Sequence, residues 1–196
     1  MTPQDEPRSG APALTPEVEA FIAEQVRLKV AEQLKAQGID VTRPKRVAII
    51  ASKGTLDMAY PPLILATTAA AMDMEVEIFF TFYGLSLIQK DKYAHLKVPP
   101  LANPAMPVPV PNIIGVLPGM TWAATWMMQS WMNKQGVPSI PSLVDMAKES
   151  GVRLVACQMS MDVLGIKKED LIDGVEFAGA GTFLDFAADA AITLFV

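Results

Sequence analysis

The sequence predicts an α/β fold, a three-layer sandwich with a mostly parallel five-stranded sheet of the flavodoxin-like type, preceded by an N-terminal amphipathic helix. Two observations lead to this prediction. Short apolar runs, typical of strands buried on both faces, recur along the chain. Segments with helical periodicity alternate with these runs, as expected for a parallel sheet covered on both faces. A chain of 196 residues is long enough for one such domain and a short appendage.

The N-terminal part is predicted to contain a tail and one helix. Residues 1–14 are polar and rich in proline, which is typical of a disordered tail. Thr15-Pro16 supplies an N-cap with proline at the first helical position, and Gly38 ends the helix. We therefore expect a helix within residues 15–40, amphipathic because its apolar side chains recur on one face. Residues 46–196 are predicted to form the main domain.

The main domain is predicted to alternate strands and helices. The strands are expected at residues 47–51, 75–80, 152–156, 175–177 and 192–196. The helices are expected at residues 57–72, 82–92, 120–135, 139–150, 160–164, 168–172 and 182–190. Residues 98–111 are rich in proline and are expected to form a long loop, a class of loop that is usually functional or mobile.

Composition and charge narrow the possible functions. The net charge of −5 argues against a nucleic-acid partner, because binding a phosphate backbone requires basic surface. A single cysteine and a single histidine exclude an intrachain disulfide and the usual zinc sites, so no metal is expected. The turn at Ser52–Thr55 lacks nucleotide-binding fingerprints, and no cofactor is predicted. The N-terminus does not resemble a secretory signal, so a reducing cytoplasm is the expected compartment.

An uncharged stretch from residue 98 to residue 133 raises the question of a membrane. A spanning helix needs about 20 mostly apolar residues, and Pro118-Gly119 interrupts this stretch. We therefore expect a buried or oligomer-facing helix, with a membrane-spanning helix or peripheral membrane association as the lesser alternatives. The charged fraction of only 19% also suggests apolar area buried between subunits, which favours a homo-oligomer.

Cys157, the only cysteine, is the strongest candidate for a reactive residue. It directly follows the predicted strand 152–156, and open parallel sheets bind ligands at the carboxyl ends of their strands. A thiolate is the nucleophilic form, and the pKa of a thiol falls near a helix N-terminus or a cation. The helix near Ser160 and the side chain of Lys53 would supply these effects; Asp162 would oppose them unless it caps the helix. The alternative is that Cys157 is a small buried hydrophobe.

Further side chains are expected at the same edge of the sheet. The loops after the first, second and fourth strands should converge on the thiol if their strands are neighbours. Lys53 is equally well explained as a solvated turn residue, Asp57 is better explained as an acid in the first turn of a helix, and core packing is the alternative for Tyr83. The predicted supporting residues are Ser52, Lys53, Gly54, Asp57, Thr81, Tyr83, Ser160 and Asp162.

The segment ACQMSMDVLG at residues 156–165 resembles the cysteine motif of the large DsrE-like branch of the DsrE/DsrF/DsrH superfamily. The resemblance extends over about residues 46–196 and is also carried by residues 52–57, 79–85 and 166–175. It implies a parallel five-stranded α/β sandwich in which Cys157 carries sulfur as a persulfide. It also implies exchange with TusA-like or rhodanese-type proteins. The proline-rich, uncharged segment 99–118 departs from the Lys- and Met-rich loop of the family, which leaves the identity of the partner open.

The sequence therefore predicts a sulfur-relay protein, sulfurtransferase-like if it is an enzyme. Two alternatives stay open. A thiol-dependent enzyme of peroxidase type would need external reduction, because the chain has no second cysteine to resolve an oxidised thiol. A non-catalytic ligand-binding or assembly module of flavodoxin-like fold would make Cys157 incidental.

Overall fold

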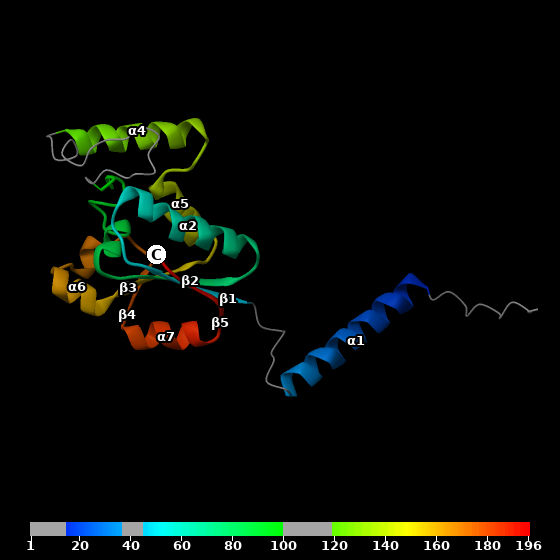
Figure 1. Ribbon diagram of the computed structural model, residues 1–196. Helices are drawn as coiled ribbons and strands as arrows, with labels where there is room; N and C mark the ends of the chain where they lie inside the picture. Colours follow the sequence, from blue (N-terminus) through cyan, green and yellow to red (C-terminus); the bar gives the residue numbers. More distant parts are fainter. Residues whose placement is uncertain (1–14, 37–44, 100–118) are drawn as a thin grey trace, which may run out of the picture. The chain divides into compact units, whose positions relative to one another are not determined.

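The computed structural model describes residues 15–36, 45–99 and 119–196 (Figure 1). The chain separates into two compact units, Met1–Pro44 and Lys45–Val196. In the first unit, helix α1 spans Pro16–Ala36, within the helix predicted for residues 15–40. The predicted tail at residues 1–14 and the end of that predicted helix lie outside the described residues.

Five parallel strands in the second unit form one sheet, in the order β4-β3-β2-β1-β5. The strands are β1 (Arg46–Ala51), β2 (Glu75–Phe80), β3 (Arg153–Cys157), β4 (Val175–Ala178) and β5 (Ala190–Phe195). The predicted α/β fold with a parallel five-stranded sheet is thus confirmed. The order of the strands was not predicted: the chain advances from β1 to β4 toward one edge, and β5 then returns to the other side of β1.

Helices cover both faces of the sheet (Figure 1). On one face lie α2 (Leu56–Ala71) and α5 (Ile140–Glu149), with α4 (Met120–Lys134) beyond them. On the other face lies α7 (Ala180–Ala188). The short helix α6 (Gln158–Leu164) follows β3, and two 3-10 helices, η1 (Phe82–Leu87) and η2 (Lys168–Asp170), complete the elements.

Two of the predicted helices are shorter than expected. Residues 82–92 form only η1 and then turns, and residues 168–172 form only η2. Where the helices were expected to continue, Gln89 and Leu171 instead form an antiparallel bridge. Backbone groups that pair across this bridge are not available to extend a helix. A long-range pairing therefore overrides the local helical pattern.

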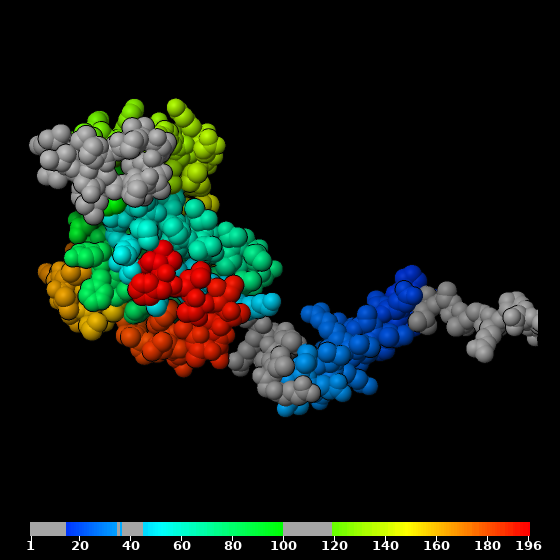
Figure 2. All heavy atoms as spheres, in the orientation of Figure 1, coloured from blue at the N-terminus to red at the C-terminus, as the bar shows by residue number. Residues whose placement is uncertain are grey.

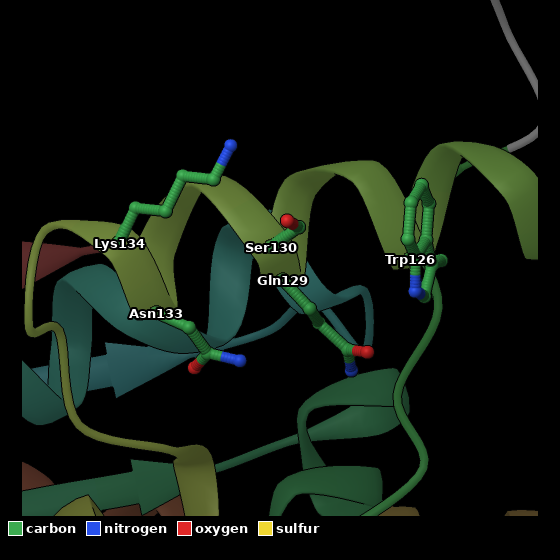
Figure 3. A pocket seen from close by; sticks show the side chains of 5 residues that line it. All are labelled: Trp126, Gln129, Ser130, Asn133 and Lys134. Atoms are coloured by element: carbon green, nitrogen blue, oxygen red, sulfur yellow. The ribbon is translucent and has the colours of Figure 1, made fainter.

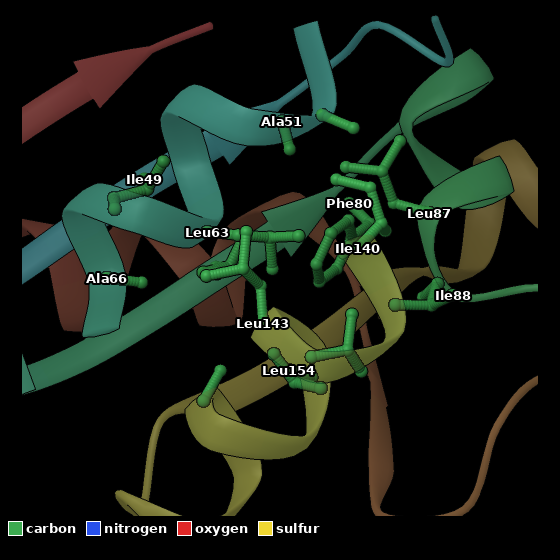
Figure 4. Packing of buried hydrophobic residues seen from close by; sticks show 14 of the residues in the cluster. Ile49, Ala51, Leu63, Ala66, Phe80, Leu87, Ile88, Ile140, Leu143 and Leu154 are labelled. Carbon is green, nitrogen blue, oxygen red and sulfur yellow. The ribbon is translucent and has the colours of Figure 1, made fainter. Parts of the chain in front are cut away.

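Each face of the sheet carries its own apolar cluster. The first, which we call the α2–α5 cluster, includes Ile49, Leu63, Phe80, Leu143 and Leu154 (Figure 4). The second, which we call the α7 cluster, consists of Ala48, Phe79, Val155, Cys157, Phe183 and Phe186. Successive side chains of a strand point to opposite faces, which explains why neighbouring residues of β3 divide between the two clusters.

Strand β5 forms one edge of the sheet and lies largely at the surface (Figure 2, red). The side chains of Ile192 and Phe195 are 42% and 73% exposed. The strand contains no charged residue, although charges and prolines are the usual protection of an exposed edge against pairing with another chain. This edge is therefore suited to contact with a second protein surface.

Helix α4 combines buried and exposed positions. Met128 and Met132 pack against the α2–α5 cluster, whereas Trp122 and Trp126 are exposed. The backbone amide of Val98 donates a hydrogen bond of 3.2 Å to the Oγ1 of Thr125, a buried residue of this helix. No helix in the described ranges has both the length and the hydropathy needed to cross a membrane.

Candidate functional site

Cys157 is the last residue of β3, and its side chain lies in the α7 cluster. The residue is only 3% exposed, and its partner across the sheet is Ala178 at the end of β4. Its backbone is extended and it occupies the N-cap position of α6, where its side chain makes no capping hydrogen bond. The thiol is thus at the carboxyl end of a strand, as the sequence indicates, but it is enclosed.

Two of the predicted supporting residues contact each other directly. The hydroxyl groups of Thr81 and Ser160 share a hydrogen bond of 2.9 Å. Ser160 is fully buried, and the backbone amide of Thr81 donates to the carbonyl of Ala51 at 3.0 Å. This hydroxyl pair ties α6 to the loop that follows β2, and so it fixes the helix that begins beside Cys157.

Gly54 and Gly84 allow the loops after β1 and β2 to pack backbone against backbone. A Cβ atom on Gly84 would lie 2.0 Å from the carbonyl oxygen of Ala51, and one on Gly54 would lie 2.4 Å from that of Tyr83. Backbone oxygens at such distances leave no room for any side chain. The two loops therefore converge at the edge of the sheet, and glycine at these positions is required by contact.

Four other predicted residues take separate positions. The amide and the hydroxyl of Ser52 both donate to the carbonyl of Val196, at 2.8 and 2.9 Å. Lys53 is exposed and has no ion-pair partner in the part of the chain that the structure describes. Asp57 lies in the first turn of α2, and its buried Oδ1 has no hydrogen-bond partner among the described residues. Tyr83 is 71% exposed, so the alternative of core packing is wrong for this residue.

Asp162 does not cap the start of α6. Its carboxylate accepts a hydrogen bond of 3.0 Å from the Nε2 of Gln158, one turn earlier in the same helix. The helix begins at Gln158, two residues before the predicted start at Ser160, because Cys157 itself occupies the N-cap. The capping role considered for Asp162 from the sequence is therefore wrong.

A charged cluster lies near the opposite ends of the strands, next to α7. Arg153 forms ion pairs of 2.7 Å with both Glu77 and Glu176. The ring of Phe186 lies 5.7 Å from the guanidinium carbon of Arg153 and 5.1 Å from that of Arg46. Sequence reasoning missed this cluster, although charges inside otherwise apolar strands were a visible signal. These contacts hold the second half of α7.

The two carboxyl groups that pair with Arg153 have pKa values shifted in opposite directions. Glu77 is 1% exposed, and its burial raises its pKa above the ordinary value although Arg153 opposes the shift. Glu176 is more open to solvent, and the hydrogen bond that it accepts from Arg153 lowers its pKa. The charges that pair with Arg153 on the α7 side of the sheet therefore change with pH, at different pH values for Glu77 and Glu176.

Exposed apolar side chains follow the carboxyl ends of β2 and β3. Phe82, Met159 and Val163 are 47%, 60% and 68% exposed. Phe82 has a φ of +47°, in the left-handed region that non-glycine residues seldom adopt and that is often found at functional sites. The sequence did not reveal this rim because Phe82 was expected to begin an ordinary helix. We call these three residues the apolar rim.

A surface hollow lies on α4, separate from these residues (Figure 3). It is lined by Trp126, Gln129, Ser130, Asn133 and Lys134. All five side chains come from one helix, and none of them is a predicted site residue. The hollow therefore adds nothing to the environment of Cys157.

Comparison with known proteins gives a matching family model and several similar proteins. The model of the DsrE/DsrF/DrsH-like family matches residues 43–195. The chain is 48% identical over 158 residues to the sulfur carrier protein DsrE2 of Allochromatium vinosum, covering 78% of this chain and 98% of that protein. It is 33% identical over 162 residues to the uncharacterized protein YrkE of Bacillus subtilis, covering 78% and 97%. Among solved structures, the ychN protein of E. coli covers 79% of this chain and 100% of its own, with a TM-score of 0.47 and 15% identity.

Proposed function

Because the chain belongs to the DsrE/DsrF/DrsH-like family, we propose that it is a sulfur-relay protein that carries sulfane sulfur as a persulfide on Cys157. One observation carries the proposal. A protein named as a sulfur carrier is 48% identical to this chain, in a match that covers 98% of that protein and 78% of this chain. A persulfide forms on a cysteine thiol, and the chain has a single cysteine. A persulfide on this chain can therefore form only at Cys157.

In the proposed reaction, the thiolate of Cys157 attacks the outer sulfur of a donor persulfide. A new S–S bond forms on Cys157 while the S–S bond within the donor breaks, and the donor leaves as a thiolate. Attack by an acceptor thiolate on the outer sulfur of the Cys157 persulfide then passes the sulfur on and regenerates the Cys157 thiolate. The transfer conserves electrons, so it needs neither an oxidant nor a reductant.

TusA-like or rhodanese-type proteins are the partners that we propose. The apolar rim supports a protein partner, because its exposed side chains follow the strand ends near Cys157 and exposed apolar surface is typical of interaction sites. The uncharged edge strand β5 supports assembly into a homo-oligomer. The cytoplasm is the proposed compartment because its reducing conditions keep a single thiol free.

The test is the mass of the intact protein after incubation with thiosulfate and a rhodanese, or with a persulfide donor. We expect wild type to gain the mass of one sulfur atom, released by a reducing agent, and Cys157→Ser to gain none. Circular dichroism of the variant checks that it is folded. A wild-type thiol that ignores sulfur donors but forms sulfenic acid rapidly with peroxide would support the peroxidase-type alternative. Inertness to both reagents would support the non-catalytic module.

A further inference from the structure

The thiol that this proposed function requires is closed off from solvent. Cys157 is 3% exposed and belongs to an apolar cluster. Exchange of sulfur between two proteins requires the attacking thiolate to reach the sulfur of its partner, so its rate depends on access. An enclosed thiol cannot meet a persulfide held by a second protein. Part of the covering structure must therefore move.

Helix α7 is the cover on this side of the sheet. Each helical residue of the α7 cluster comes from α7 itself. Phe183 stacks on Phe79 of β2, with ring centroids 4.9 Å apart. Within α7, Phe183 and Phe186 are the buried residues, and the intervening side chain of Leu184 is 63% exposed. The apolar contacts of α7 with the sheet are thus few, namely those of Phe183, Phe186 and the partly buried Ala187, and elements with few buried apolar contacts open locally at low free energy.

The two halves of α7 are held differently. The second half is fixed where Phe186 lies beside the guanidinium groups of Arg46 and Arg153, and Arg46 also pairs with Asp189 at 3.4 Å. The first half begins at Gly179, which provides no side-chain capping hydrogen bond. It follows directly on Ala178, the partner of Cys157 across the sheet. The end of α7 beside the thiol is thus held by the buried ring of Phe183, whereas the other end has the contacts of Phe186 and the ion pair of Asp189.

Gly179 is the N-cap of α7, where glycine is common, but Gly181 within the first turn is not explained by the closed structure. A Cβ atom on Gly179 or Gly181 would meet nothing within 4 Å, and neither residue has a left-handed φ. Gly54, by contrast, is required because a Cβ there would strike a backbone oxygen. Glycine in a helix is less stable than alanine because it has more backbone freedom to lose. The backbone freedom that glycine brings at Gly181 would allow the first turn of α7 to move.

We propose that Phe183 controls access to Cys157 and that the first turn of α7 opens about Gly179–Gly181 to expose the thiol. Phe186 stays between its two arginines during this movement and serves as the pivot. Opening separates the ring of Phe183 from that of Phe79 and uncovers the end of β3. The inference rests on the proposed function for its purpose, whereas its test measures access alone.

The test is the rate at which iodoacetamide alkylates Cys157 in the folded protein, followed by intact mass. When closing is faster than alkylation, this rate is proportional to the population of the open form. We expect Phe183→Ala to react at least about tenfold faster than wild type, because truncating a buried aromatic ring removes much of what holds the helix closed. Gly181→Ala should react about two- to fivefold more slowly, because alanine stabilises the first turn. Leu184→Ala, an exposed neighbour, is the matched control and should stay within about twofold of wild type.

The dependence of the rate on urea separates local opening from unfolding. The slope against urea reports the surface exposed, so opening of α7 should give a slope well below that of global unfolding. A slope equal to the global one, or equal rates in wild type, Phe183→Ala and Gly181→Ala, would overturn the proposal. If Phe183→Ala does not fold, the slowing in Gly181→Ala and the urea slope of wild type decide the question.

Failure of the access inference can be distinguished from failure of the proposed function. If the chain does not carry sulfur, Phe183→Ala will alkylate rapidly and yet gain no sulfur from a donor. If sulfur carriage is right and the access inference is wrong, wild type and Phe183→Ala will load sulfur at the same rate. Both assays use the full chain and the same intact-mass measurement.

Discussion

The two faces of the sheet are packed in different ways. On one face, α2 and α5 with α4 beyond them enclose a large cluster that contains the fully buried Ile49 and Leu63. On the other face, α7 contributes two buried phenylalanines over a small cluster that contains Cys157. Local stability follows the amount of buried apolar contact. We therefore expect the α2–α5 face to be the more stable one, while Cys157 lies on the face with fewer buried apolar residues.

The largest effect is expected where the loops of the rigid part interlock. Gly84→Ala would place a Cβ atom 2.0 Å from the carbonyl oxygen of Ala51, and we expect a loss of more than about 4 kcal/mol in the free energy of unfolding. Gly181→Ala, the matched substitution in α7, should instead stabilise by about 0.5–1 kcal/mol because the site is open and helical. Urea unfolding measures both. Equal losses in the two variants would break the distinction between the regions.

The next effect contrasts two leucines. Leu63→Ala leaves a cavity in the α2–α5 cluster and should lower the free energy of unfolding by about 3 kcal/mol. Leu184→Ala on α7 removes a side chain that is 63% exposed and should change it by less than about 0.5 kcal/mol. Denaturant unfolding at one pH compares them. A loss in Leu184→Ala as large as that in Leu63→Ala would show that the outer surface of α7 is covered by a further contact.

The smallest effect concerns pH and belongs to the α7 face. The folded pKa of Glu77 is raised above its ordinary value of 4.5, so its stabilising contribution is present below that pH and is lost as pH rises through the folded pKa. The folded pKa of Glu176 is lowered, so its contribution is present above 4.5 and is lost as pH falls through the folded pKa. Relative to wild type, Glu77→Gln should therefore become more stable as pH rises, and Glu176→Gln less stable.

Urea unfolding at a series of pH values between about 3 and 7 measures these differences. The effect of Glu176→Gln should stay below about 1 kcal/mol because this side chain is half exposed and the ion pair is screened. Leu63→Ala is the control, since it lacks a titratable group and should lower the stability equally at each pH. Slopes of the same sign for the two glutamine variants would contradict the opposite pKa shifts.

Local pattern was enough to predict most of the secondary structure. The apolar runs located all five strands, including the exposed edge strand β5, because a run of apolar and β-branched residues favours a strand whatever its neighbours are. The failures at residues 82–92 and 168–172 have one cause, the bridge between Gln89 and Leu171, which joins segments distant in the chain. Thr81 and Ser160 were both predicted at the same edge of the sheet, and their hydroxyl groups do meet there, since both residues follow the carboxyl ends of neighbouring strands.

Periodicity and the order of the elements were enough to predict the fold class, the parallel sheet and the placement of Cys157 at the end of a strand. The tertiary structure alone decided the order of the strands and the face on which Cys157 lies. It also decided that Phe183 closes over this face, since that contact joins residues from separate elements. Cys157 is a buried thiol that shares a cluster with two phenylalanines of α7, because burial is set by packing and not by sequence neighbours.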